Sequence, residues 1–362
     1  NRRRRSLARA WVRWPPGADL EKTLLLRRLA DDTAMTVRNL EYLFRPASVA
    51  VVAEPDEASR YADVVLANLA AGGFSGPVMS VVARQRRLFL LSTGVRLGKL
   101  EVVPDLAVIC ASLDKVPSII EQLGSLGTRA VVVGPWLWHR MRGGEIAAAR
   151  RGILSAARPF LMRVLGPGSG GIVVPAHGLN ASAAPVAIAA GKIALVTHST
   201  AVTAAVLDRA CSKDIGFSTV LHLGAGLDVD LADVLDWLAG DDGTKSILVQ
   251  FDTVPAGRKF MSAARAAARH KPVVAIRVRP LADGSGAASL SADEVYAAAL
   301  RRAGWVSVDT LGGVFEAVEG MARMRPLRGE RLTILANGHG LGRIAGETLQ
   351  RAGGKLGKLS QE

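Results

Sequence analysis

Four turns in this sequence place small, hydroxyl-bearing or charged residues directly after short apolar runs. In an open α/β sheet such turns lie at the carboxyl ends of strands, where backbone amides and helix N-termini face anionic ligands. We therefore interpret the turns as candidate ligand contacts. The residues selected are Ala53, Glu54, Pro55, Ser59 and Tyr61 in the first turn, Val82, Arg84 and Arg86 in the second, Ala111 and Ser112 in the third, and Ser199 and Thr200 in the fourth.

Each turn also has a plainer interpretation. The arginines after Val82 could pair with phosphate or form a solvated basic loop, and Ser112 could admit a flat ligand group or cap the next helix. Ser199 beside His198 suggests a nucleophile, but GxSxG is absent and adjacent residues point in different directions, so a hydrolase is not expected. The first turn lacks the glycines that let a backbone approach phosphate, and Glu54 would repel one.

Metal and redox chemistry are not indicated by the sequence. Only two cysteines are present, Cys110 and Cys211, and the six histidines have no metal-ligand spacing. We predict no metal site and no catalytic residue in this chain. The low cysteine content fits a reducing compartment, and we expect a cytoplasmic protein.

Short apolar runs alternate with helix-period segments from residue 47 onward, which predicts an α/β fold with parallel sheets covered on both faces. A glycine-rich break over 166–171 and a turn-rich connection over Ile172–Gly191 separate two such series. The expected strands are Ser48–Ala53, Pro77–Val82, Leu106–Cys110, Arg129–Val133 and Met162–Leu165, then Lys192–Thr197, Thr219–Leu223, Ser246–Phe251, Pro272–Val278 and Trp305–Val308.

A third series begins near residue 331 with one strand, one helix and one more strand. Three elements cannot bury a core of their own, so we expect a domain that continues beyond the sequence. At the other end, the first 34 residues carry a net +5 of the total +14, and the first methionine is Met35. We interpret this basic extension as lying outside the working protein; a functional arm and a transit peptide are the alternatives.

The remaining positive charge is spread along the chain without an aromatic-interleaved basic stripe, so a nucleic-acid partner is not expected. No uncharged apolar run reaches the ~18 residues of a membrane helix, so a membrane partner is not expected either.

Several glycine-rich motifs in the second half carry a family resemblance. They are GPGS at 166–169, GLNA at 178–181, GKIALVTHS at 191–199, GFS at 216–218 and LGAGLDVD at 223–230. Together they resemble the NDP-forming acyl-CoA synthetase superfamily, which includes succinyl-CoA synthetase and ADP-forming acetate–CoA ligase. Within it, a further set of stretches resembles the Pat-type bacterial protein lysine acetyltransferases, which add a GNAT domain: Leu40–Pro46, Leu69–Val78, Gly178–Val186, Met324–Gly329, Leu332–Gly338 and Gly354–Glu362.

The resemblance implies a domain order. After the extension over 1–37, a Rossmann-like CoA-binding domain would span 38–170 and a succinyl-CoA ligase-like flavodoxin domain 171–328, with 329–362 beginning a truncated third flavodoxin-like domain. The selected turn residues would then contact CoA or acetyl-CoA, and ATP with Mg²⁺ would bind only where further domains are present.

One absence shapes the functional prediction. Synthetases of this superfamily carry phosphate on a histidine, whereas the segment 279–302 contains none, and serines there cannot replace an imidazole nucleophile. Asp252 stands where the superfamily has a glutamate facing that histidine. The favoured interpretation is a catalytically silent, CoA-binding region of a protein lysine acetyltransferase. The alternatives are an ADP-forming acetate–CoA ligase α subunit and a derived, non-enzymatic interaction module.

The expected partners follow from this interpretation. They are a CoA thioester and, in the intact protein, lysine-bearing protein substrates. Homo-oligomerisation is left open.

Overall fold

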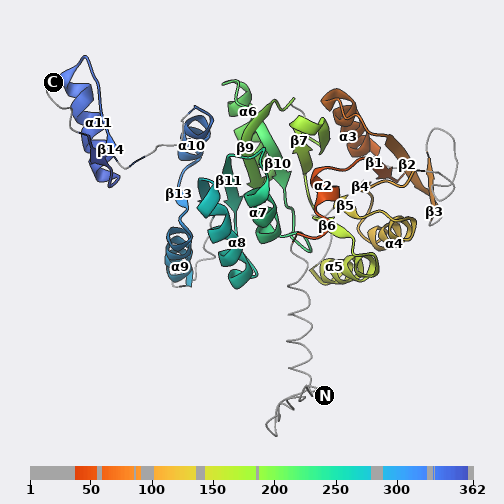
Figure 1. The fold of residues 1–362 in the computed structure, drawn as a ribbon. Helices are drawn as coiled ribbons and strands as arrows, with labels where there is room; N and C mark the ends of the chain where they lie inside the picture. The colour runs from red at the N-terminus through yellow and green to blue at the C-terminus, as the bar shows by residue number, and fades with distance from the viewer. Residues whose placement is uncertain are drawn as a thin grey trace, which may run out of the picture. The chain divides into compact units, whose positions relative to one another are not determined.

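A computed structural model describes residues 37–54, 59–84, 87–90, 102–135, 143–184, 187–278, 288–323, 329 and 331–357. Contacts between elements divide the chain into two compact units, Asn1–Ala322 and Arg323–Glu362. The larger unit contains two open sheets with helices on both faces (Figure 1).

The first sheet has the strand order β3-β2-β1-β4-β5-β6. Its strands are β1 (Val49–Ala53), β2 (Val78–Arg84), β3 (Arg87–Leu90), β4 (Leu106–Cys110), β5 (Ala130–Val133) and β6 (Arg163–Leu165). All neighbours pair in parallel except β2 and β3, which are antiparallel at the edge. The order reverses direction between β1 and β4, the point where open α/β sheets bind ligands.

Helices cover both faces of this sheet. They are α2 (Glu41–Phe44), α3 (Ser59–Gly72), α4 (Val116–Leu126) and α5 (Gly143–Ala157). In α4 the buried residues Val116, Ile119, Ile120 and Leu123 recur at helical spacing and pack on the sheet, and the helix ends at Gly127, whose φ of 110° suits glycine. Helices α2 and α3 lie on the opposite face from α4 and α5 (Figure 1).

The second sheet has the order β13-β12-β11-β9-β10-β7-β8. Its strands are β7 (Gly171–Val174), β8 (Leu179–Ser182), β9 (Ala190–Thr197), β10 (Phe217–His222), β11 (Ser246–Phe251), β12 (Val273–Arg277) and β13 (Val306–Val308). Strands β7 and β8 form an antiparallel pair that joins β10. The prediction of a turn-rich connection over this segment was therefore wrong. Gly171 has a φ of 102°, and an added Cβ would meet the Ala181 carbonyl oxygen at 2.2 Å.

Five helices flank the described part of the second sheet: α6 (Thr200–Cys211), α7 (Leu231–Gly240), α8 (Gly257–His270), α9 (Ala288–Ala303) and α10 (Leu311–Arg323). Helix α7 begins with a capping box in which Asp230 and Asp233 each accept the other's backbone N–H. Apolar residues of α7 and α8 pack on one face of the sheet, and those of α6 and α10 on the other.

One hydrophobic core runs through both halves of the larger unit. It joins α2, α3 and the first sheet to α7, α8 and the second sheet. At the junction Phe44 stacks on Trp237 with ring centroids 4.9 Å apart, and Asn68 donates to the carbonyl oxygens of Ser182 and Ala184 at 2.9 Å. An added Cβ at Gly72 would lie 2.6 Å from the Gly178 carbonyl oxygen, so α3 and the start of β8 are in close contact. The two halves therefore share their packing.

The smaller unit contains β14 (Arg331–Leu332), α11 (His339–Arg351) and β15 (Lys355–Leu356), with the two strands paired in parallel. Its apolar residues Leu335, Leu341 and Ile344 are exposed.

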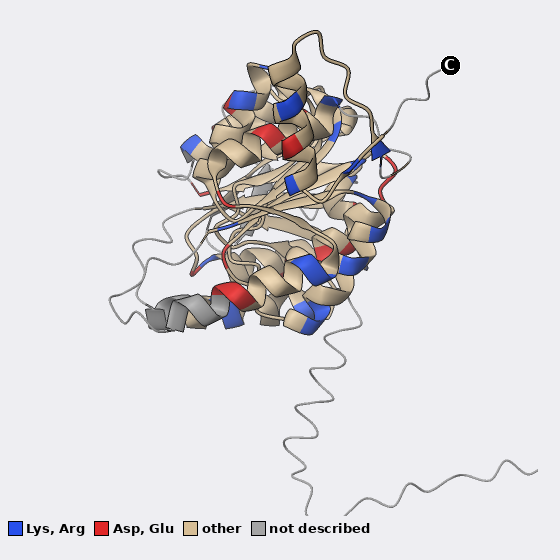
Figure 2. Ribbon diagram, turned by 90° about the vertical axis from the view of Figure 1, so that its left-hand side faces the viewer, with Lys and Arg blue, Asp and Glu red and all other residues tan. Residues whose placement is uncertain are grey.

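In Figure 2 the charged segments lie mostly on helices and loops, and the strands are almost entirely uncharged. Among the described residues no helix has the length and hydrophobicity to cross a membrane.

Candidate functional site

The carboxyl edge of the first sheet brings several of the selected residues together. Ala53, the last residue of β1, is in register with Val82 on β2 and with Cys110 on β4. Glu54 follows Ala53, and Ala111 and Ser112 follow Cys110, so these residues lie at the reversal point between β1 and β4. Small side chains at this position let a flat ligand group approach the backbone.

Glu54 has its charge neutralised within this edge. The side chain is only 4% exposed, and one carboxylate oxygen accepts from the Ser112 backbone N–H at 2.9 Å and from Ser112 Oγ at 2.8 Å. The other oxygen forms an ion pair with Lys115. Burial alone would raise the pKa of Glu54, but the bonds from Lys115 and Ser112 outweigh it and lower the pKa.

This arrangement shows that the capping interpretation of the third turn was wrong, whereas contact with a flat ligand group stays a prediction. Ser112 does not cap α4, because the N-cap is Lys115 and no side chain bonds to the first turn. The Ser112 amide is already bonded to Glu54, so it is not available to a ligand phosphate. Lys115, which the sequence analysis did not select, supplies the positive charge. No motif marks a lysine 61 positions beyond its partner.

Three other residues selected near this edge lie in β2 or at the start of α3. Val82 is buried in the sheet, Ser59 begins α3 and Arg84 ends β2. Pro55 and Arg86 lie outside the described residues. A cation near the end of β2 therefore stays a sequence-based prediction.

The carboxyl edge of the second sheet carries Ser199 and Thr200. Ser199 is the N-cap of α6, and its Oγ accepts from the Val202 backbone N–H at 3.3 Å. His198 lies in a separate cavity of about 190 Å³ with Asp252 and the loop Gly224–Gly226. Burial lowers the pKa of His198, although the Asp252 charge opposes the shift. Asp252 also accepts from Gln250 at 2.9 Å.

A second cavity unites residues from the two edges. It has a volume of about 260 Å³ and is lined by Tyr61 on α3, Thr200 on α6 and His222 on β10, among others. Tyr61 and Thr200 were both selected from the sequence, but nothing in the sequence indicated that they line one cavity. His222 was not selected, because it is a single histidine at a strand end and no motif links it to a partner.

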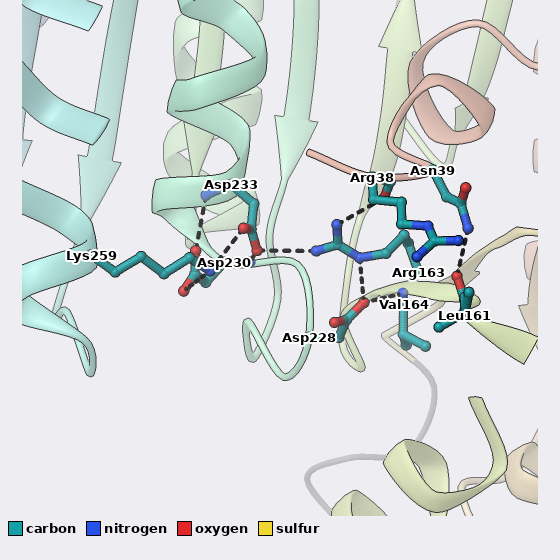
Figure 3. Close-up of polar contacts among 9 residues, drawn as sticks. All are labelled: Arg38, Asn39, Leu161, Arg163, Val164, Asp228, Asp230, Asp233 and Lys259. Atoms are coloured by element: carbon teal, nitrogen blue, oxygen red, sulfur yellow. Dashed lines mark hydrogen bonds and ion pairs between the residues drawn. The ribbon is translucent and has the colours of Figure 1, made fainter. Parts of the chain in front are cut away.

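Arg163 on β6 connects the two halves through buried ion pairs (Figure 3). Its side chain is 2% exposed; Nε donates to Asp228 at 2.9 Å, and one terminal nitrogen to Asp233 at 3.1 Å. The other terminal nitrogen donates to the Arg38 carbonyl oxygen at 3.1 Å. Both carboxylates belong to the second half, so this arginine fixes β6 against the start of α7.

The same cluster extends toward the cavity that holds His198. Lys259 on α8 pairs with Asp230 at 3.0 Å and with Asp233 at 2.7 Å (Figure 3). Asp230 lines that cavity. A chain of charges therefore runs from β6 of the first sheet to the carboxyl edge of the second. Among the described residues no cluster of histidine, cysteine and acidic side chains could hold a metal ion.

These features define an α/β protein with two open, mostly parallel sheets that follow each other along the chain. Family models agree with each half: a CoA binding domain matches residues 47–175, and a succinyl-CoA ligase like flavodoxin domain matches residues 190–321. The chain therefore carries a CoA-binding domain followed by a succinyl-CoA ligase-like domain, as the motifs implied.

Individual relatives are acyl-CoA ligases. The chain is 28% identical to the α subunit of ADP-forming acetate–CoA ligase I from Pyrococcus furiosus, over 87% of this chain and 70% of the relative. It is 30% identical to the ADP-forming acetate–CoA ligase I from Archaeoglobus fulgidus, of which it spans 47%. The structure of a Ca. Korarchaeum cryptofilum dinucleotide-forming acetyl-coenzyme A synthetase 1 with phosphate and ADP superposes with a TM-score of 0.76 at 26% identity, over 89% of this chain and 70% of that one.

Proposed function

We propose that this chain binds CoA or a CoA thioester as the α-subunit-like part of an NDP-forming acyl-CoA ligase. The observation that carries the proposal is the reversal point between β1 and β4, where Ala53 and Ala111 lie at adjacent strand ends within the matched CoA-binding domain. The ligase relatives favour this function over the acetyltransferase region suggested by the terminal motifs. Lysine-bearing protein substrates gain no support from them.

The different parts of CoA fit this edge differently. The small side chains of Ala53 and Ala111 leave the backbone accessible to the flat or flexible parts of the cofactor. A phosphate beside Ser112 is disfavoured, because Glu54 already takes the amide and hydroxyl donors there. The phosphates would then lie toward the end of β2, where the sequence places Arg84 and Arg86. The Glu54–Lys115 pair compensates the negative charge of the Glu54 carboxylate at this edge.

The reaction step assigned to this chain is limited by the missing histidine. Formation of an acyl-CoA through a phosphorylated histidine needs an imidazole that the segment 279–302 does not contain. CoA supplies the thiol that accepts the acyl group. The residues of this chain would bind and orient that thiol, and the activating phosphoryl transfer would require other groups.

Calorimetric titration of the chain with CoA tests the proposal. We expect binding by the wild-type chain and a loss of about tenfold or more in Ser112→Asp, since a second carboxylate beside Glu54 repels the cofactor. Ser125→Asp, at the exposed far end of α4, is the matched control and should bind as the wild type does. Absence of CoA binding at millimolar concentrations would refute the proposal.

A second measurement tests the limit on catalysis. The chain is incubated with acetate, CoA and ATP with Mg²⁺, and acetyl-CoA is measured by chromatography. We expect none above the protein-free background. Clear formation would contradict the assignment of the phosphoryl step to groups outside this chain.

A further inference from the structure

The cavity between Tyr61 and Thr200 has a predominantly apolar wall. Val173 and Val220 form its floor on β7 and β10, and Leu207 of α6 closes one side. All three are buried, whereas Thr200 and Ala204 on α6 are exposed and form part of its rim. Among the described lining residues none is Lys, Arg, Asp or Glu. A ligand group that enters this cavity must therefore be uncharged.

Tyr61 places this cavity beside the edge assigned to CoA. Its ring lies against the end of β5, since a Cβ added at Gly134 would be 3.2 Å from the ring. Its hydroxyl oxygen is buried, and in the described part of the chain it has no hydrogen-bond partner. A buried hydroxyl without a partner costs free energy that a ligand carbonyl would recover by accepting a hydrogen bond. Burial raises the pKa of Tyr61, so the hydroxyl keeps its proton.

His222, the titratable group in the cavity wall besides Tyr61, carries no charge at neutral pH. Its Nδ1 accepts from the Gly170 backbone N–H at 2.9 Å, and burial lowers its pKa to about 4. The imidazole therefore offers a ligand carboxylate no positive charge. A dicarboxylic acyl group such as succinyl would bring its free carboxylate into the cavity without a counter-ion.

We infer that this cavity holds the acyl group of the CoA thioester, and that the acyl groups it takes are uncharged, apolar and larger than acetyl. The inference rests on the proposed CoA binding. A dry apolar cavity of ~150 Å³ accommodates a benzene molecule. The volume of about 260 Å³ found here therefore admits a chain of several carbons or one aromatic ring. An acetyl group would leave most of it unfilled.

Calorimetry with a thioester series tests this inference on the full chain. The affinity is measured for CoA, acetyl-CoA, butanoyl-CoA, hexanoyl-CoA and succinyl-CoA. Each buried methylene should strengthen binding by up to about fourfold. We expect hexanoyl-CoA to bind at least about tenfold more tightly than acetyl-CoA, and succinyl-CoA no more tightly than acetyl-CoA.

Variants at the rim of the cavity locate the effect. Ala204→Trp should abolish the gain with chain length while leaving the affinity for CoA itself unchanged, and Thr200→Trp is a second blocking variant from the same rim. Ala201→Trp, exposed on the same helix but away from the cavity, is the matched control and should keep the gain. Equal affinities for hexanoyl-CoA and acetyl-CoA, or a gain that survives both blocking variants, would overturn the inference.

A truncated thioester separates this inference from the proposed function. S-hexanoyl-N-acetylcysteamine has the acyl group and thioester but no nucleotide. If CoA does not bind, the proposed function fails; a shift of the thermal midpoint by the truncated thioester, absent in Ala204→Trp, would still support the acyl cavity. If CoA binds and neither hexanoyl probe is favoured, the acyl inference alone fails.

Discussion

Replacing Arg163 by methionine should weaken the junction between the two halves. Removing one partner of a buried ion pair typically costs about 3–5 kcal/mol. Here Asp233 keeps Lys259 at 2.7 Å, and Asp228 keeps the Val164 backbone N–H at 2.8 Å. Neither carboxylate is left without a partner, and methionine fills much of the vacated volume. We therefore expect the free energy of unfolding to fall by the lower figure, about 3 kcal/mol.

Urea unfolding followed by tryptophan fluorescence measures this loss, and Trp237, one of the six tryptophans, lies at the junction. Arg209→Met is the matched control, because its pair with Glu319 at 2.9 Å is 45% and 28% exposed and should contribute at most about 1 kcal/mol. Asp228→Asn should cost less in the Arg163→Met background than in the wild type, since the two side chains interact directly. A loss in Arg163→Met no larger than that in Arg209→Met would refute the reasoning.

Three further predictions concern stability. The pKa of His222, lowered to about 4, lies below the value near 6.5 of the unfolded chain, so the contribution of this histidine to stability should fall by up to about 3 kcal/mol as pH drops from 6.5 to 4. His222→Gln should flatten that slope in urea unfolding at several pH values; an unchanged slope would contradict it. Glu54→Gln should lower the free energy of unfolding by about 1 kcal/mol. The amide oxygen can still accept from the Ser112 backbone N–H, but the ion pair with half-exposed Lys115 is lost. An increase in the free energy of unfolding would contradict this prediction. Gly72→Val should lower the free energy of unfolding by about 1–3 kcal/mol, because the new Cβ would lie 2.6 Å from a backbone carbonyl oxygen. Gly240→Ala should have little effect, because nothing lies within 4 Å of the added Cβ. Equal thermal midpoints of these two glycine variants would show that the close contact at Gly72 does not determine stability.

Buried parallel strands could be predicted well from the sequence, because continuous Val, Ile and Leu runs mark strands covered on both faces. Leu106–Cys110 and Ser246–Phe251 have the predicted bounds. The antiparallel strands were not predicted. β7 and β8 are four residues long, are joined through a short 3-10 helix and contain glycine and asparagine, so local propensity favoured turns. Their pairing is a property of the assembled sheet.

The candidate site was predictable only where it follows from strand order. Residues after β1 and β4 could be selected because the ends of parallel strands meet at one edge. We expected Glu54 to repel phosphate because the sequence shows an isolated carboxylate. Its charge is neutralised by Lys115, and that contact depends on how α4 packs on the sheet. The cavity shared by Tyr61 and Thr200 depends on the contact between the halves, which no local pattern encodes.

The continuous core of the larger unit bears on how such proteins can change by recombination. The two family models suggest that the chain could be divided between residues 175 and 190. A crossover there would take Phe44 and Trp237, and Arg163 and its partners Asp228 and Asp233, from different parent chains, so these contacts would form only where both parents carry the same residues. A chimaera of two relatives would inherit both domains intact and still fold poorly. The two halves match separate family models, yet they share one core and would have to be exchanged together.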